Sequence, residues 1–135
     1  MPQYRIVYCP DLIIFSSLSV ALTTKGQVFS LGNNAFGQCG RPVIQNEDYF
    51  RSQVIHPVHI PLLEKNDVIV DIECGVNHSL FLSQNGKVYS CGWSADGQTG
   101  LGHYNNQPIP EKVKGTYSRG HLVVHISVRV VLKFF

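Results

Sequence analysis

Short apolar runs of strand length recur along this chain, with turn-forming residues between them. Residues 79–83 and 88–91 are rich in β-forming side chains, and Asn85-Gly86 between them accepts a tight turn with positive φ. A third apolar run, 68–72, precedes this pair. No apolar pattern between residues 12 and 113 keeps a helical period with capping residues. The pattern therefore predicts β-hairpins.

The chain also repeats itself. Segments 19–40 and 79–100 are identical at ten of 22 positions when one is shifted by 60 residues. Each copy predicts a hairpin followed by a loop with a Gly-Gln-x-Gly core. The identical pairs are Ser19/Ser79, Leu22/Leu82, Gly26/Gly86, Val28/Val88, Ser30/Ser90, Gly32/Gly92, Ala35/Ala95, Gly37/Gly97, Gln38/Gln98 and Gly40/Gly100.

A repeat of this size with short strands indicates an all-β fold, in which each unit is a propeller blade of four antiparallel strands. We expect a partial β-propeller of about two blades that does not close. The chain divides into an atypical N-terminal segment, a first degenerate repeat with a long loop, a second repeat, and a tail outside the repeats. These parts span residues 1–18, 19–67, 68–115 and 116–135.

The tail has a strand pattern of its own. Every second residue from 124 is apolar, and most of the residues between are polar, which is typical of a strand. Such a strand would either pair with the last blade or leave an uncovered edge that promotes aggregation. The apolar face would carry Val124, Ile126, Val128, Val130, Leu132 and Phe134.

The second copy carries an ordered set of short motifs: a Cys-Gly pair precedes His-Ser, and Gly-x-Val-Tyr-x-Cys-Gly and Gly-Gln-x-Gly-x-Gly follow. This order resembles the regulator of chromosome condensation repeat family, and especially its mitochondrial member. The first copy lacks the Cys-Gly pair and the His. The resemblance implies a closed seven-bladed propeller, so this chain is expected to be a fragment or a truncated form. The signature positions are Cys74, Gly75, His78, Gly86, Gly92, Gly97, Gln98, Gly100 and Gly102, with Gly26, Gly32, Gly37, Gln38 and Gly40 in the first copy.

Composition and motifs exclude several function classes. A net charge of +2 gives no basis for direct DNA binding, and no apolar stretch approaches the roughly 20 residues of a membrane span. No Cys-x-x-Cys pair, nucleophile motif or pair of carboxylates at a useful spacing occurs. We therefore expect no catalytic, metal or cofactor site, and no enzyme. His78 is expected to be structural, although a metal ligand or a catalytic base is the alternative.

The best candidates for binding a partner lie on the loop after residue 92. Aromatic, hydroxyl and imidazole groups gather there, and loops on one rim of a propeller are common contact surfaces. The alternative for Trp93 is packing between blades. The predicted partner-binding residues are Trp93, Ser94, Asp96, His103 and Tyr104.

The expected function is therefore a non-catalytic protein-interaction module. The resemblance implies guanine nucleotide exchange on a GTPase, in the mitochondrial case a dynamin-like fusion GTPase. Its alternatives are a scaffold with proteins of mitochondrial ribosome or ribosomal-RNA assembly, and an inactive truncated product. The resemblance also implies a mitochondrial location, although no presequence is visible in this chain, and a cytoplasmic location is the alternative.

Overall fold

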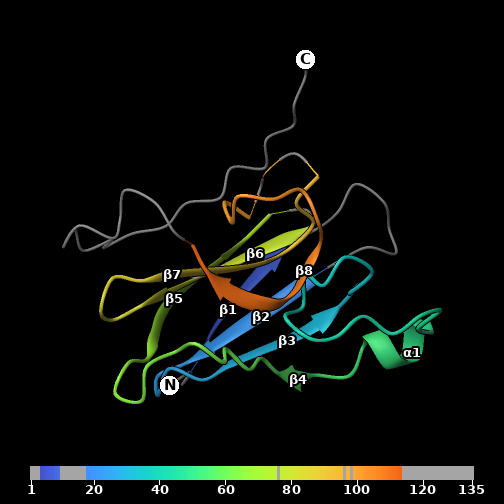
Figure 1. The fold of residues 1–135 in the computed structure, drawn as a ribbon. Coiled ribbons are helices and arrows are strands. Elements are labelled where there is room, and N and C mark those ends of the chain that lie inside the picture. The colour runs from blue at the N-terminus through green and yellow to red at the C-terminus, as the bar shows by residue number, and fades with distance from the viewer. Residues whose placement is uncertain (1–3, 10–17, 76, 96, 98, 114–135) are drawn as a thin grey trace.

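The protein is built from two antiparallel β-sheets of four strands each, which pack against each other (Figure 1). The computed structural model describes residues 4–9, 18–75, 77–95, 97 and 99–113, and only the backbone of 4–9 and Tyr49. The predicted tail strand at 124–134 lies outside the described residues. Within the described part, no helix is long and apolar enough to cross a membrane.

Each sheet follows chain order, so neighbouring strands are also consecutive. The first sheet comprises β1 (Tyr4–Cys9), β2 (Leu18–Thr23), β3 (Val28–Gly32) and β4 (His56–Pro57). The second comprises β5 (Ile69–Cys74), β6 (His78–Ser83), β7 (Val88–Gly92) and β8 (Gln107–Lys112). One short helix, α1 (Tyr49–Ser52), lies between β3 and β4.

The predicted hairpins are confirmed, and their turns have the same backbone hydrogen bond and the same positive φ. The Gly26 amide donates to the Thr23 carbonyl over 3.0 Å, and the Gly86 amide donates to the Ser83 carbonyl over 3.0 Å. Both glycines have φ near +80°, at 82° and 80°. A residue without Cβ adopts this geometry at little cost. The repeat seen in the sequence is therefore a repeat of backbone conformation.

Two outer strands lacked a clear sequence signal. β1 lies inside the segment 1–18 and pairs with β2 along its whole length, from Tyr4 opposite Thr23 to Cys9 opposite Leu18. β8 contains Pro108 and Pro110 and forms the edge of its sheet. An edge strand tolerates proline because its missing amide faces away from the ladder. Both strands complete the four-strand pattern.

The core lies mainly between the two sheets. Strand β2 of the first sheet packs against β5 of the second. Residues of β2 alternate between buried and half-buried, so that one face is fully covered. Apolar burial of this kind is the main force that holds the sheets together. The core residues are Leu18, Val20, Leu22, Val28, Cys39, Ile60, Ile69, Ile72, Cys74, Phe81, Tyr89 and Cys91, with Val58 and Leu63 packed against them.

The loop after β3 that contains Gly37 and Gly40, called the glycine loop below, packs closely against the second sheet. A Cβ at Gly37 would lie 2.3 Å from the Cα of Pro108, and one at Gly40 would lie 3.3 Å from the Pro110 ring. The Ser79 hydroxyl, on β6, donates to the Gln38 carbonyl over 2.7 Å. Direct backbone approach therefore joins the sheets here, in addition to side-chain packing.

A pair of substitutions distinguishes the close packing of Gly37 against Pro108, called the clamp here, from the strain of positive φ alone. Gly37 and Gly97 have φ of 83° and 78°, but among the described residues a Cβ at Gly97 would meet only Tyr104, at 3.9 Å. Gly97→Ala should therefore lose about 1–2 kcal/mol from the left-handed conformation alone. Gly37→Ala should lose about 1–3 kcal/mol more, because the methyl group overlaps Pro108. Urea unfolding of the two variants measures the difference, and equal losses would contradict the clamp.

Candidate functional site

The loop predicted to bind a partner is held by its own hydrogen bonds. The Ser94 hydroxyl lies 2.7 Å from the Thr99 hydroxyl and donates to the His103 carbonyl over 2.9 Å. From β7, the Ser90 hydroxyl donates to the Thr99 carbonyl over 2.6 Å. Ser90, Ser94 and Thr99 are almost completely buried. Ser94 thus shapes the loop from inside and presents no group to a partner.

The outer part of the same loop is open. The Tyr104 side chain is 74% exposed, among the most exposed large side chains in the described part. The Asn105 amide donates to Nδ1 of His103 over 3.2 Å, so Nε2 carries the proton and donates to Oε1 of Gln107 over 3.2 Å. His103 is therefore oriented by its neighbours. The hydrogen-bonded segment 103–107 thus displays one exposed aromatic ring and one imidazole that its neighbours orient.

Trp93, on the same loop, contacts the first sheet. Its ring stacks on that of Phe36 with centroids 5.5 Å apart and an interplanar angle of 23°. Phe36 belongs to the glycine loop of the first sheet, so the contact joins the two sheets. The structure brings together Ser94, His103 and Tyr104, with Trp93 at their inner end, while Asp96 lies outside the described residues.

The signature residues that the structure describes lie in turns, in loops and at strand ends. The His78 ring lies over Gly75, where an added Cβ would be 2.3 Å from Cε1 of the imidazole. Its burial lowers the pKa of His78 from the ordinary value of 6.5. The paired loop glycines have matching positive φ, and Gln98 lies outside the described residues. Among the described residues, no group of three or more His, Cys, Asp or Glu has the arrangement of a metal site.

The free thiols are enclosed between apolar side chains and lack the environment of a nucleophile. Burial raises the pKa of Cys39 to about 11, although the Arg41 charge opposes this shift. Burial also raises the pKa of Cys91, well above its usual range. Both thiols therefore stay protonated at neutral pH, and only a thiolate attacks. Cys74 is disulfide-bonded.

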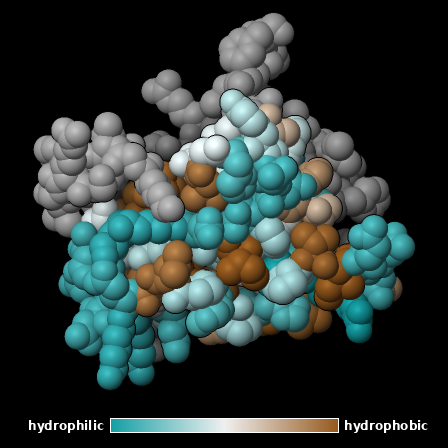
Figure 2. Space-filling model, in the orientation of Figure 1, coloured by the Kyte–Doolittle hydropathy of each residue, from teal (hydrophilic) through white to brown (hydrophobic). Residues whose placement is uncertain are grey.

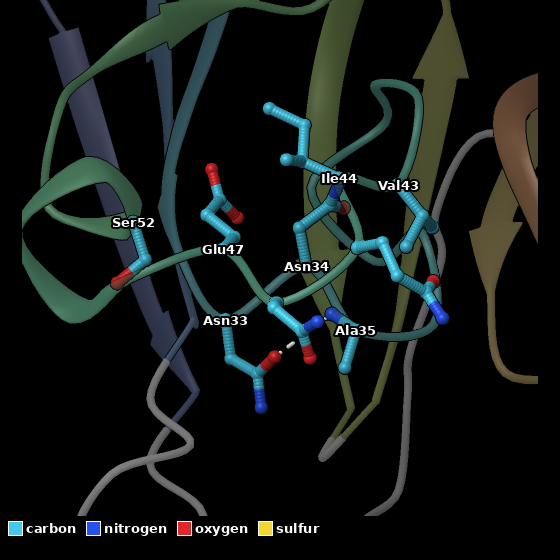
Figure 3. Close-up of a pocket in the computed structure, with 9 residues that line it drawn as sticks. Asn33, Asn34, Ala35, Val43, Ile44, Glu47 and Ser52 are labelled. Atoms are coloured by element: carbon cyan, nitrogen blue, oxygen red, sulfur yellow. Dashed lines mark hydrogen bonds between the residues drawn. The ribbon is translucent and has the colours of Figure 1, made fainter.

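A pocket of about 600 Å³ lies on the long loop between β3 and β4, which sequence reasoning did not single out (Figure 3). The Asn34 side chain holds this loop together with two hydrogen bonds. Its amide nitrogen donates to the Arg41 carbonyl over 3.0 Å, and its oxygen accepts from the Cys39 amide over 3.0 Å. Arg41 also forms a salt bridge with Glu47 at 2.8 Å. The lining residues are Asn33, Asn34, Ala35, Val43, Ile44, Gln45, Asn46, Glu47 and Ser52.

Several apolar side chains on this long loop are exposed. Phe50, Val54 and Ile55 are 82%, 52% and 56% exposed. Figure 2 shows apolar areas interspersed with hydrophilic side chains on the face in view. The available signal was three apolar or aromatic dipeptides in this loop, at 43–44, 49–50 and 54–55. Isolated apolar pairs are common on surfaces, so the pattern alone did not indicate a site.

The pattern of paired strands, glycine loops and inter-sheet contacts matches a known repeat. The family model described as the regulator of chromosome condensation (RCC1) repeat matches residues 25–82 and 85–128, and a second model of that description matches 69–98. The chain belongs to the RCC1 repeat family. The first RCC1 unit begins in the β2–β3 turn and ends in β6, so it contains strands of both sheets. The second continues to residue 128, into the segment 116–135 that sequence analysis set apart.

Similar proteins are much longer than this chain. The human "RCC1-like G exchanging factor-like protein" is 50% identical over 97 residues, which are 72% of this chain and 20% of that protein. The mouse protein of the same description is 47% identical over 109 residues, or 81% and 23% of the two chains. The chain thus spans about a fifth of the relatives it matches.

Solved structures give the same fold. The crystal structure of human WBSCR16 matches with a TM-score of 0.67 and 48% identity, over 75% of this chain and 24% of that one. Prp20p from Saccharomyces cerevisiae matches with a TM-score of 0.56 and 23% identity, over 81% and 27%. That likeness supports the propeller fold alone. The crystallographic work on Prp20p also concerns its binding to Gsp1p and histones.

The buried imidazole predicts a pH dependence of stability. Folding lowers the pKa of His78, so the folded state favours the neutral ring. The stability this ring contributes is therefore fully present above the unfolded pKa of about 6.5, and it is lost progressively as the pH falls from that value through the lower folded pKa. The urea midpoint should drop between pH 7.5 and 5.5. His78→Phe and His78→Gln should lose less over the same range, and an unchanged slope in both would rule out this role.

Proposed function

We propose that this chain is a protein-interaction module that takes part in guanine nucleotide exchange on a mitochondrial dynamin-like fusion GTPase. The observation that carries the proposal is the likeness to a G exchanging factor-like protein at 50% identity. The loop after β7, which is held by buried hydroxyl groups and carries the exposed Tyr104, supports it. Similarity over a fifth of that protein supports the class of function. The partner and the mitochondrial location are the proposed part.

Exchange needs no catalytic side chain. A factor accelerates nucleotide release if it binds the nucleotide-free GTPase more tightly than the nucleotide-bound form. A surface for this task must hold its shape before contact, because ordering a loop on binding reduces the affinity. The buried hydroxyls of Ser90, Ser94 and Thr99 fix the loop backbone in this way. Tyr104 then acts as the exposed anchor, since Tyr is frequent among residues that dominate binding.

The test measures release of a fluorescent guanine nucleotide from the purified GTPase in the presence of the full chain. Micromolar protein should accelerate release. Tyr104→Ala should weaken the effect about tenfold, the loss expected from one anchor residue of roughly 1.4 kcal/mol. Circular dichroism should remain unchanged, because Tyr104 is 74% exposed.

The matched control is Val54→Ala on the loop between β3 and β4, where the side chain is 52% exposed. This variant should leave exchange unchanged. Loss of exchange in Val54→Ala with a normal Tyr104→Ala would move the contact to the other loop and overturn the proposed surface. No acceleration by the unmodified chain at micromolar concentration would overturn the exchange function itself.

A further inference from the structure

A second pocket, of about 440 Å³, lies between the β2–β3 turn and the segment 58–68, which leads from β4 to β5 and is called the linker below (Figure 1). This volume is within the range of about 300–1,000 Å³ that is usual for ligand sites. Residues 26–29, 57–60, 63–65, 67 and 69 line the pocket. We propose that this linker pocket binds a lysine side chain of a partner protein, with the ammonium group at Asp67. The proposal does not rest on the exchange function.

The carboxylate of Asp67 is buried, and only one of its two oxygens has hydrogen-bond donors. The side chain is 4% exposed. Its Oδ1 atom accepts from the amides of Val68 and Asn85, over 3.0 Å and 3.1 Å. Its Oδ2 atom is also buried and has no donor among the described residues. A buried charged oxygen without a donor is unfavourable, so this position favours a positively charged donor.

The Tyr89 hydroxyl lies near this carboxylate and provides a second acceptor. It donates to the Leu62 carbonyl over 3.4 Å, so its proton is engaged while its own lone pairs are available. Burial raises the pKa of Tyr89, and the nearby negative charge of Asp67 raises it further. An ammonium group carries three donors and is suited to two acceptors of this kind.

A single available oxygen favours an ammonium group over a guanidinium group. Arginine pairs most strongly with a carboxylate through two parallel hydrogen bonds, one to each oxygen. At Asp67 the two amides already occupy Oδ1. The lysine ammonium is a compact point charge and needs no such fork. Lysine is therefore the basic side chain that fits this geometry.

The walls of the linker pocket suit the four-carbon stem of a lysine. Val28 and Ile60 line the pocket and are 5% and 6% exposed. Phe29, which follows on β3, is half-buried and lines the same pocket. A lysine stem packs well along apolar side chains while its charged end reaches a polar group. The pocket thus offers an apolar path that leads to a negative charge.

No lysine in the described part of the chain occupies this position. Lys87 forms a salt bridge with Glu64, and Lys65 on the linker is exposed. Oδ2 of Asp67 is covered in this structure, so an incoming ammonium group must displace neighbouring side chains. The linker is held here by turn hydrogen bonds, such as that from the Asp67 amide to the Glu64 carbonyl over 3.0 Å. Changes of side-chain rotamer are common at protein–protein contacts and need no movement of the sheets.

The test is an NMR titration of the full chain with Nα-acetyl-lysine methylamide, which carries the lysine side chain on an uncharged backbone. The amides of Val68 and Asn85 are the reporters, because both donate to Asp67. Their shifts should saturate with a Kd of about 1 mM, as expected for a ligand of this size. The arginine analogue should bind at least about threefold more weakly. The Nε-acetylated lysine analogue should cause no saturable shift, because acetylation removes the charge.

Asp67→Asn tests the carboxylate, and Asp71→Asn is the matched control. The asparagine keeps an oxygen for the two amides but carries no charge, so the lysine probe should bind at least about tenfold more weakly. Asp71 is half-buried on β5 and does not line the linker pocket, so its substitution should leave the Kd unchanged. Unchanged binding by Asp67→Asn would overturn the proposed site.

The unmodified chain gives a readout that does not depend on the folding of a variant. A ligand that binds only the folded state stabilises it, so the lysine probe at about ten times its Kd should raise the urea midpoint. The Nε-acetylated probe should not. Equal effects of these two probes, or no saturable shift with either, would overturn the proposal and leave a bound water as the partner of Oδ2. An arginine analogue that binds as tightly as the lysine probe would overturn the choice of cation.

Discussion

The contact between the glycine loop of the first sheet and the second sheet constrains the rest of the structure. Gly37 lies so close to Pro108 that no side chain fits between them. This closeness lets the Ser79 hydroxyl reach the Gln38 carbonyl. It also brings Phe36 onto Trp93. Hydrogen bonding, ring stacking and apolar burial therefore all depend on a loop whose backbone can turn with positive φ.

Comparing equivalent positions explains how one sequence motif serves two environments. The loops around Gly37 and Gly97 have the same φ and the same internal hydrogen bonds, so their backbone shape does not require a neighbouring sheet. Of the two loops, the first packs against described residues of the neighbouring sheet, at Pro108. The second loop keeps its shape through Ser90, Ser94 and Thr99 while Tyr104 stays exposed. A self-supporting loop is suited both to packing and to binding.

The sequence predicted those parts of the fold whose cause is local. The hairpin turns at Gly26 and Gly86 and the repeated glycine loops follow from backbone preferences that adjacent residues determine. β1 was not predicted because its place depends on pairing with β2 across a chain segment with no repeat signature. Of the candidate binding residues, the sequence indicated the loop but not that the Ser94 side chain is buried and that of Tyr104 exposed. That division depends on hydrogen bonds to Thr99 and His103, which no pattern of residue types shows.

The sequence unit of the family is offset from the sheets, since residues 25–82 begin in one hairpin turn and end in the next sheet's second strand. Each unit thus supplies the last two strands of one sheet and the first two strands of the next. Gain or loss of a whole unit by gene duplication or deletion joins two equivalent half-sheets at a turn. The number of sheets can then change over evolution with little strain, because the turns at Gly26 and Gly86 share the same backbone hydrogen bond and the same positive φ.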